Sequence, residues 1–304
     1  MMMQAMTRRG FVKGTAMGLA AAALGARQGW GSPWGRPVGL QLYSVREQLA
    51  KDYEGTLKQV GAIGYREVEA AGFYDRTPAQ VKQAMADAQL HCVGGHYSYS
   101  ALSANVEKIL VYHQELGCHY VICAFPGMRD TARVQGMTHR DQVHAFTVDD
   151  LRWTMDQLNG IGEKARQAGL QLGYHNHTME FAPQNGVVPF EVMLHEADKK
   201  LVTFELDCGW VKVGGGSAVE YLKKYPTQIT LLHIKDFKPT ERPADMGNPP
   251  PPAELGHGTE DYAPIFAAAK AANIKHYFVE QEGFDVPWVQ ALTTDYTYVN
   301  GLKA

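Results

Sequence analysis

Residue types that bind metals gather where four β-rich segments in the second half of the chain end. In chain order they are His175, His177, Glu180, Asp207, His233 and Glu280. Carboxylates combined with imidazoles form a mixed oxygen and nitrogen site, which suits a borderline or hard divalent ion such as Mn²⁺, Mg²⁺, Co²⁺ or Zn²⁺. We therefore predict one divalent metal ion as the cofactor. Its expected ligands are Asp207, His233 and Glu280, with a fourth from either His175 or Glu180.

Each of these residues, taken alone, has an ordinary structural explanation. An Asp or Glu at the end of a strand can cap the next helix, and a lone His is more often a satisfied core residue than a ligand. Only their joint occurrence at several strand ends favours a metal site. The prediction therefore depends on a fold that brings those ends together.

The rest of the chain predicts such a fold, because short β-rich runs alternate with amphipathic helical runs, as in parallel βαβ units. The expected strands are Val38–Tyr43, Tyr65–Glu69, His91–Gly95, Tyr120–Ala124, Leu170–Tyr174, Leu201–Leu206, Ile229–Ile234 and His276–Glu280. Eight strands are the number in a closed (β/α)8 TIM barrel, whose active sites lie at the C-terminal ends of the strands. An open doubly wound sheet is the alternative, but no Gly-x-Gly-x-x-Gly turn follows the first strand.

Helices are expected between the strands because apolar residues recur there at helical spacing. Their ranges are Tyr53–Ile63, Pro78–Gln89, Ser103–Leu116, Val148–Ala168, Pro189–Ala197, Val219–Lys224, Tyr262–Ala271 and a last helix from Pro287. Two irregular insertions, Phe125–Thr147 and Lys238–Thr259, follow the fourth and seventh strands. We expect both to cover the catalytic face.

The N-terminus has the pattern of a twin-arginine export signal. Thr7–Lys13 contains the Arg pair, a Phe and a Lys, and a weakly apolar run from Gly14 to Ala26 follows. A disordered basic N-terminus is the alternative. We predict a signal peptide at residues 1–32, a barrel domain at residues 33–304 and a periplasmic location.

Composition excludes several other classes of protein. Removing a leader with four basic residues and no acidic one changes the formal charge from −3 to about −7. An acidic domain binds nucleic acid poorly, so no nucleic-acid partner is expected. No run is long and apolar enough to span a membrane once the leader is gone. The four cysteines are expected to be core thiols, because they lie in apolar runs without ligand spacing.

Further polar residues at the predicted strand ends are candidates for binding substrate. Lys235 and Asp236 follow His233 and could bind substrate hydroxyls, although a surface ion pair explains them equally well. Trp210 could stack on a sugar, or it could simply pack. His96 falls near another strand end, and Glu69 is a candidate for orienting a metal ligand.

With these motifs in place, the chain resembles the sugar phosphate isomerase/epimerase superfamily, the xylose isomerase-like barrels. The resemblance runs from Val38 to Glu282. It is carried by Leu206-Asp207-x-Gly209-Trp210, His233-Ile234-Lys235-Asp236 and Phe278-Val279-Glu280-Gln281. These motifs are more specific for the superfamily than for one reaction.

The resemblance implies Glu, Asp, His and Glu ligands around one divalent metal, with the two glutamates moving protons on opposite faces of the substrate. Asp207, His233 and Glu280 match that pattern, but His175 stands where many members have the first glutamate. One of the two acid/base groups of the family is then missing, or its role has moved to Glu180 or His177. Glu280 or Glu180 is the expected base.

The implied chemistry is removal of a proton next to a metal-polarised carbonyl, with stabilisation of the enediolate. Returning the proton gives isomerisation or epimerisation, and loss of a β-leaving group gives elimination. We expect a sugar isomerase or epimerase, with a lyase or dehydratase of a keto-sugar or 3-keto-glycoside as the alternative. A non-catalytic sugar-binding barrel is a third reading. The expected partner is a small, non-phosphorylated sugar, and the chain is compatible with a homo-oligomer.

Overall fold

Eight parallel strands pair into a closed ring in the computed structural model, which describes residues 35–302. They are β1 Gly39–Gln41, β2 Glu67–Ala70, β3 His91–Ser98, β4 Tyr120–Phe125, β5 Gln171–His175, β6 Val202–Asp207, β7 Ile229–Ile234 and β10 His276–Val279. The first strand pairs with the last, with Gly39 opposite Phe278. This closure confirms the predicted barrel and excludes the open sheet.

Side-chain alternation along the strands separates an apolar layer from a polar interior. Leu40, Phe204 and Leu232 are fully buried in the hydrophobic core between the strands and the helices. Each such side chain contributes about 1.5–3 kcal/mol through its burial. Residues two apart share a face of a strand, so the alternate positions point into the barrel, where Glu205 and His233 meet.

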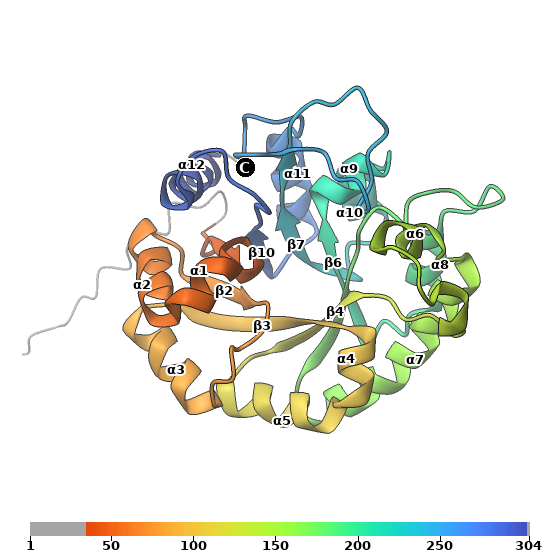
Figure 1. Cartoon of the computed structure of the whole chain (residues 1–304), viewed down its shortest axis with the longest axis horizontal. Coiled ribbons are helices and arrows are strands. Elements are labelled where there is room, and N and C mark those ends of the chain that lie inside the picture. The colour runs from red at the N-terminus through yellow and green to blue at the C-terminus, as the bar shows by residue number, and fades with distance from the viewer. Residues whose placement is uncertain (1–34, 303–304) are drawn as a thin grey trace, which may run out of the picture.

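Helices surround the ring of strands (Figure 1). They are α1 Arg46–Lys51, α2 Tyr53–Ile63, α3 Pro78–Asp87, α4 Tyr99–Ala104, α5 Val106–Leu116, α6 His139–His144, α7 Val148–Gln167, α8 Pro189–Glu196, α9 Cys208–Val213, α10 Ala218–Lys224, α11 Tyr262–Ala271 and α12 Trp288–Gly301. Thr77 and Thr147 begin α3 and α7 with capping boxes, which satisfy backbone N–H groups of the first turn.

The structure corrects the prediction of one helix at Ser103–Leu116. Two helices, α4 and α5, occupy this region and meet at Asn105, whose φ of −140° is not helical. The strand before them is also longer than predicted, because β3 continues to Ser98. Side-chain capping by Ser98, which accepts a hydrogen bond from Ala101 N–H, starts the additional helix.

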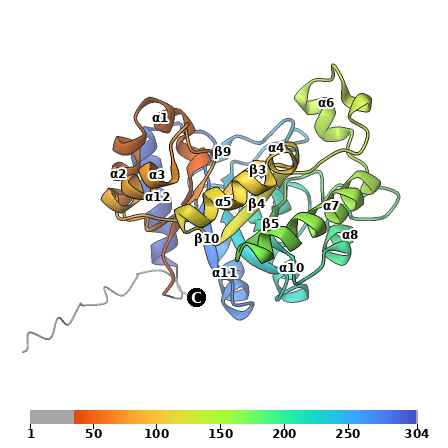
Figure 2. The same cartoon turned by 90° about the horizontal axis from the view of Figure 1, so that it is seen from below.

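Both insertions lie at the C-terminal end of the strands, as expected. The first contains a 3₁₀ turn at Thr131–Val134 and then α6. The second contains β9 Pro252–Ala253, which pairs antiparallel with β8 Asp236–Phe237. Figure 2 shows α6 and β9 at the end of the molecule opposite to α10 and α11.

The predictions about the cysteines, membrane-spanning segments and the N-terminal signal have different outcomes. Cys92, Cys118, Cys123 and Cys208 are buried and free, which confirms core thiols. Within residues 35–302, no helix has the length and apolar character needed to cross a membrane. The predicted signal peptide, residues 1–32, lies outside the described residues.

One buried acid in α12 makes stability depend on pH. Asp295 Oδ1 accepts a hydrogen bond from Leu255 N–H at 2.7 Å, while Oδ2 has no partner. Burial above all, together with the nearby Glu254 carboxylate, raises the pKa of the Asp295 carboxyl to about 7. Because the folded pKa exceeds the unfolded value of about 3.9, this group stabilises the fold at low pH, and its contribution is lost as pH rises through 7.

We expect Asp295→Asn to stabilise the protein by roughly 1–3 kcal/mol at pH 8, because a neutral amide removes the cost of a buried charge. The variant and the parent should have similar stability near pH 4, where the parent carboxyl is protonated. Thermal unfolding of both proteins from pH 4 to 8 measures the difference. An identical pH dependence of Tm in the two proteins would contradict this role for Asp295.

Candidate metal centre

Four side chains from neighbouring strands converge at the C-terminal end of the barrel. His175 ends β5, Asp207 ends β6, His233 lies in β7 and Glu280 directly follows β10. One ligand atom of each lies within 4.8 Å of the others, and all four side chains are buried. The structure thus brings together the three residues expected to hold a metal and places His175, rather than Glu180, beside them.

The spacing of these groups suits a cation. His233 Nδ1 lies 4.0 Å and His175 Nε2 lies 3.9 Å from Asp207 Oδ2. Ligand atoms about 2.1 Å from an ion are roughly 3–4 Å from one another. Asp207 Oδ2 is also buried without a hydrogen-bond partner, and the Lys235 ammonium lies 3.4 Å away, so this oxygen remains available to a metal ion. The cluster can therefore bind a divalent metal ion.

The two imidazoles differ in how readily they give up a proton. Burial and the neighbouring His233 lower the pKa of His175 to about 3, so its ring is neutral at neutral pH. Burial also disfavours the charged form of His233, but the Glu205 carboxylate raises the pKa of His233 well above its usual value. A metal ion at His233 would have to displace a proton, so metal affinity should fall with decreasing pH.

Lys235 lies inside this cluster rather than on the surface, which excludes the surface ion pair as its explanation. Its Nζ is 2.8 Å from Glu280 Oε2 and 3.4 Å from Asp207 Oδ2, and the side chain is 2% exposed. It also contacts Glu282 and lies 4.8 Å from the centre of the Trp210 ring. Burial alone would lower the pKa of Lys235, but the carboxylates around it, Asp207 first, raise it well above its usual value.

A second group of polar side chains lies deeper in the barrel. His96 Nε2 is 2.7 Å from Glu69 Oε2 and 2.8 Å from Glu205 Oε2. His233 Nε2 contacts the same two carboxylates at 2.9 and 3.1 Å. Glu69 was expected to orient a ligand, whereas Glu205 had no predicted role. The sequence indicates only that Glu205 faces the same side of β6 as Asp207, which it precedes by two residues, and not which side chains it meets.

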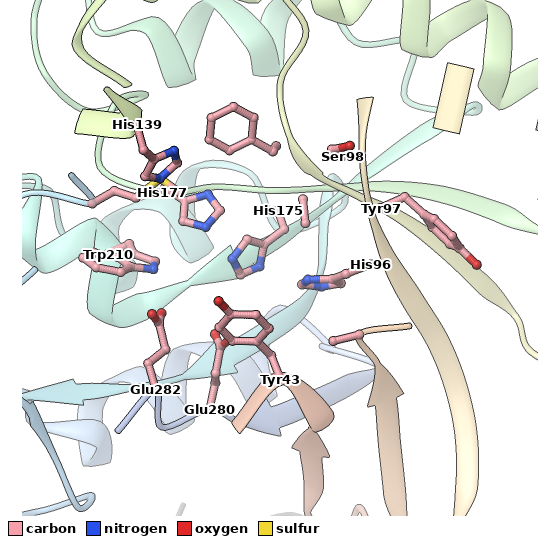
Figure 3. Close-up of a pocket in the computed structure, with 14 residues that line it drawn as sticks. Tyr43, His96, Tyr97, Ser98, His139, His175, His177, Trp210, Glu280 and Glu282 are labelled. Carbon is pink, nitrogen blue, oxygen red and sulfur yellow. The ribbon is translucent and has the colours of Figure 1, made fainter. Parts of the chain in front are cut away.

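The cluster opens into a cavity of about 470 Å³. Five of the predicted site residues line this cavity: His96, His175, His177, Trp210 and Glu280. Figure 3 shows Glu280 and Glu282 on one side of the cavity and His177 on the other. The two insertions contribute His139 and Met246 to its wall, so they cover the catalytic face. Cavity residues that the sequence did not single out include Tyr97, Phe125, His139, Met246 and Glu282.

His177 lines the cavity, but Glu180 does not. The Glu180 carboxylate is buried behind this wall, where it accepts hydrogen bonds from the Tyr174 hydroxyl at 2.6 Å and from His177 N–H at 2.9 Å. Burial raises the pKa of Glu180 to about 7. Glu180 therefore supports the loop that carries His177, and the structure does not place it as a ligand or a base.

Asp236 also has a position different from the one expected. Its buried carboxylate accepts hydrogen bonds from several backbone N–H groups between Gly256 and Glu260, including that of Thr259 at 2.8 Å. It also accepts one from Phe237 N–H. Asp236 does not line the cavity. Its oxygens are occupied by the second insertion, so it shapes that loop instead of binding substrate hydroxyls.

The chain belongs to the xylose isomerase-like TIM barrel family, which matches residues 57–295. Among curated relatives, the inosose dehydratase of Clostridium perfringens is 20% identical over 196 residues, covering 61% of this chain and 64% of the relative. The chain thus spans less than two thirds of that relative's length. The inosose dehydratase of Geobacillus thermodenitrificans is 22% identical over 251 residues, covering 75% of this chain and 80% of the relative.

Solved structures agree with this assignment. A sugar phosphate isomerase/epimerase from Parabacteroides distasonis superimposes with a TM-score of 0.67 and 26% identity, covering 86% of this chain and 96% of that one. A xylose isomerase-like TIM barrel protein from Mycobacterium smegmatis, in complex with magnesium, superimposes with a TM-score of 0.61 and 16% identity. The match covers 88% of this chain and 97% of that one. The IolI protein with a bound zinc atom superimposes with a TM-score of 0.64 and 13% identity, covering 86% of this chain and 96% of that one.

These proteins define an enzyme superfamily with isomerase, epimerase and dehydratase members, which act on small sugar-type substrates. Neighbours in fold bind zinc or magnesium, and this chain has a His, Asp and Glu cluster that could bind a metal.

We expect Asp207→Asn to weaken metal binding by more than about 100-fold, because it removes an anionic ligand while keeping the shape of the side chain. Elemental analysis after dialysis measures the metal retained. Glu67→Gln is a matched control, since Glu67 pairs with His276 at 2.7 Å, away from the cluster. Full metal content in Asp207→Asn would show that the ligands lie elsewhere.

Proposed function

We propose that this chain is a divalent-metal-dependent sugar isomerase or epimerase that moves a proton next to the carbonyl group of a non-phosphorylated sugar. The observation that carries the proposal is the cluster of His175, Asp207, His233 and Glu280 at the floor of the cavity. Its members are buried and of mixed oxygen and nitrogen type, and two of them, His175 and Glu280, also line the cavity. Membership of the family supports the same class of reaction.

The lining of the cavity supports a substrate without a phosphate group. Among the described residues, its wall contains no Arg and no Lys, and it contains the carboxylates of Glu280 and Glu282. Phosphate sites normally present Arg, Lys or a helix N-terminus. Lys235 lies behind the wall, paired with three carboxylates. A neutral sugar suits this wall better than an anion, and the exposed Tyr43 ring could stack on it, whereas the Trp210 ring is buried against Phe237 and Lys235.

Glu280 is the base in this proposal. Burial disfavours its charged form, but Lys235 and His233 lower the pKa of the Glu280 carboxyl well below its usual value, so it is ionised at neutral pH. An ionised carboxylate at the cavity can accept the proton of a substrate C–H group and return it. When bound, a divalent ion would polarise the substrate carbonyl as a Lewis acid.

Two other side chains complete the proposed machinery. Lys235 lies behind the cavity wall and places a positive charge next to Glu280 and Asp207, which keeps the Glu280 carboxylate ionised. His177 faces Glu280 across the cavity (Figure 3), and its buried Nδ1 has no partner. Burial lowers the pKa of His177 well below its usual value, so the ring is neutral at neutral pH and can bind a substrate hydroxyl by a hydrogen bond.

A lyase or dehydratase is the second candidate, and the asymmetry of the site favours it. The carboxylates that line the cavity, Glu280 and Glu282, follow the same strand, so both lie on one wall. Epimerisation needs proton transfer on two faces, whereas elimination needs one base and an acid for the leaving group. His175 in place of a second glutamate leaves His177 as the group opposite. The inosose dehydratases among the relatives support this reading as well.

The proposal predicts that the metal-loaded protein incorporates deuterium from D₂O into a keto-sugar at the carbon next to the carbonyl, because the exchanged proton passes through the solvent-accessible site. Ketoses, an inosose and 3-keto-glycosides form the test panel, followed by NMR and mass spectrometry. Chelation of the metal should abolish exchange, and phosphate esters of the same sugars should react at least about 10-fold more slowly.

The products separate the candidates. A rearranged or epimerised sugar supports the first, and loss of water or of an aglycone supports the lyase. Tight sugar binding without exchange or product, in protein that retains its metal, would contradict both and favour a binding protein.

Export to the periplasm is a further part of the proposal. It rests on the Arg8-Arg9 pair and the apolar run after it. Fractionation of cells that express the full chain, compared with Arg8→Lys plus Arg9→Lys, tests it. Equal amounts in the cytoplasm for both chains would contradict export by this route.

A further inference from the structure

We infer that Glu205 is a positioning residue of the metal centre: its carboxylate fixes which ring nitrogen of His175 faces the ligand cluster and, together with Glu69, does the same for His233. This inference rests on the metal-dependent function proposed above. Glu205 lies two residues before Asp207 on β6, so the two side chains share one face of the strand, with Glu205 one step deeper in the barrel. Its side chain is fully buried.

One oxygen of Glu205 faces three imidazoles. Oε2 lies 3.1 Å from His175 Nδ1, 3.1 Å from His233 Nε2 and 2.8 Å from His96 Nε2. These are hydrogen-bond distances. An ionised carboxylate only accepts hydrogen bonds, so each nitrogen that faces Glu205 must carry the hydrogen.

The consequence is the same for both metal-binding histidines, although they use different nitrogens. In a neutral imidazole one nitrogen donates and the other presents a lone pair. With a hydrogen on Nδ1, His175 presents Nε2 toward Asp207, 3.9 Å away. With a hydrogen on Nε2, His233 presents Nδ1 toward Glu280 and Asp207, at 3.0 and 4.0 Å. The 3.0 Å contact is a hydrogen bond to Glu280, so a bound metal ion would displace the hydrogen from Nδ1 but not the one on Nε2. The nitrogens of both rings that do not face Glu205 therefore point into one cluster.

Glu205 and Glu69 differ in this role. Glu69 Oε2 contacts His233 and His96, and it also accepts a hydrogen bond from Gln41 Nε2 at 2.7 Å. Within the described residues, the carboxylate that lies within hydrogen-bond distance of His175 Nδ1 is that of Glu205. Loss of the Glu69 charge leaves His233 with Glu205, whereas loss of the Glu205 charge leaves His175 with no carboxylate on its inner side. Substitution of Glu205 should therefore weaken metal binding more than substitution of Glu69.

The same deep group could instead hold a second metal ion, because His96, His175, Glu205 and His233 also offer atoms within 4.8 Å of one another. Two features favour hydrogen bonds. The distances of 2.7–3.1 Å from the imidazole nitrogens to Glu69 and Glu205 are those of donor and acceptor pairs. A second ion would also need both nitrogens of His175 and of His233 at once, so both rings would have to lose both protons.

The test compares the full-length protein with Glu205→Gln, Glu69→Gln and the control Glu67→Gln. An amide at position 205 is close in shape, but its NH₂ group donates, so it can turn a ring to the wrong tautomer. Zn²⁺ affinity is measured by competition with a chelator. We expect Glu205→Gln to weaken binding by about 10–100-fold, Glu69→Gln by less than about 10-fold and Glu67→Gln not at all.

The tautomers of the His175 and His233 rings can be measured without an activity assay, first in the parent protein. Long-range ¹H–¹⁵N NMR of the Zn²⁺-loaded parent should show hydrogen on Nδ1 of His175 and on Nε2 of His233. In Glu205→Gln, the His175 signals should shift to the other tautomer or to a mixture. Circular dichroism checks that each variant is folded.

Several results would overturn the inference. The opposite tautomers in the parent protein, or parent-like affinity in Glu205→Gln, would exclude a positioning role while leaving the proposed function standing. Two Zn²⁺ ions per chain would assign the deep group to a second metal. A parent protein that binds no divalent metal would remove the proposed function and this inference together.

Discussion

The burial of several charges at one level inside the barrel is the constraint on which the rest of the site depends. Glu69 of β2 and Glu205 of β6 approach from strands four positions apart in the ring of eight, and His96 and His233 approach from β3 and β7, which are also four apart. Burying an isolated carboxylate destabilises the fold by roughly several kcal/mol, so each of these carboxylates must have a partner. The imidazoles supply that pairing, with N···O distances from 2.7 to 3.1 Å. Packing of the outer apolar layer then holds the strands at the spacing that these contacts need.

The deep pairs in turn fix the groups above them. Because His233 is held from below by carboxylates, its other nitrogen is free to join Asp207 and Glu280 at the mouth of the barrel. Lys235 balances the excess negative charge there. The insertions close the space above: His144 of the first pairs with Asp245 of the second at 2.9 Å, so the two loops form one cover over the cavity. Reaction chemistry of this kind benefits from such a cover, since excluding water strengthens each electrostatic contact.

The amino-acid sequence was sufficient to predict the features of the fold that depend on the alternation of strands and helices. Eight strands, their order in the ring and the meeting of Asp207 with its partners all follow from βαβ alternation. Loop backbone was not predictable in the same way. Asp236 and Glu180 have the residue type of a site, yet their carboxylates bind backbone N–H groups whose positions depend on how the loops turn. Glu205 was missed for a different reason: it lies within a strand, where an acid is expected only if partners from across the barrel neutralise it. Those partners, His96 above all, are distant in sequence.

Anomalous diffraction from crystals of the full chain soaked with Zn²⁺ tests the central claim most directly, because it locates the ion relative to named side chains. A single strong peak between His175, Asp207, His233 and Glu280 is the predicted result, with no peak between Glu205 and His96. A peak among the deeper side chains, or no peak in the barrel at all, would contradict the assignment of the metal centre.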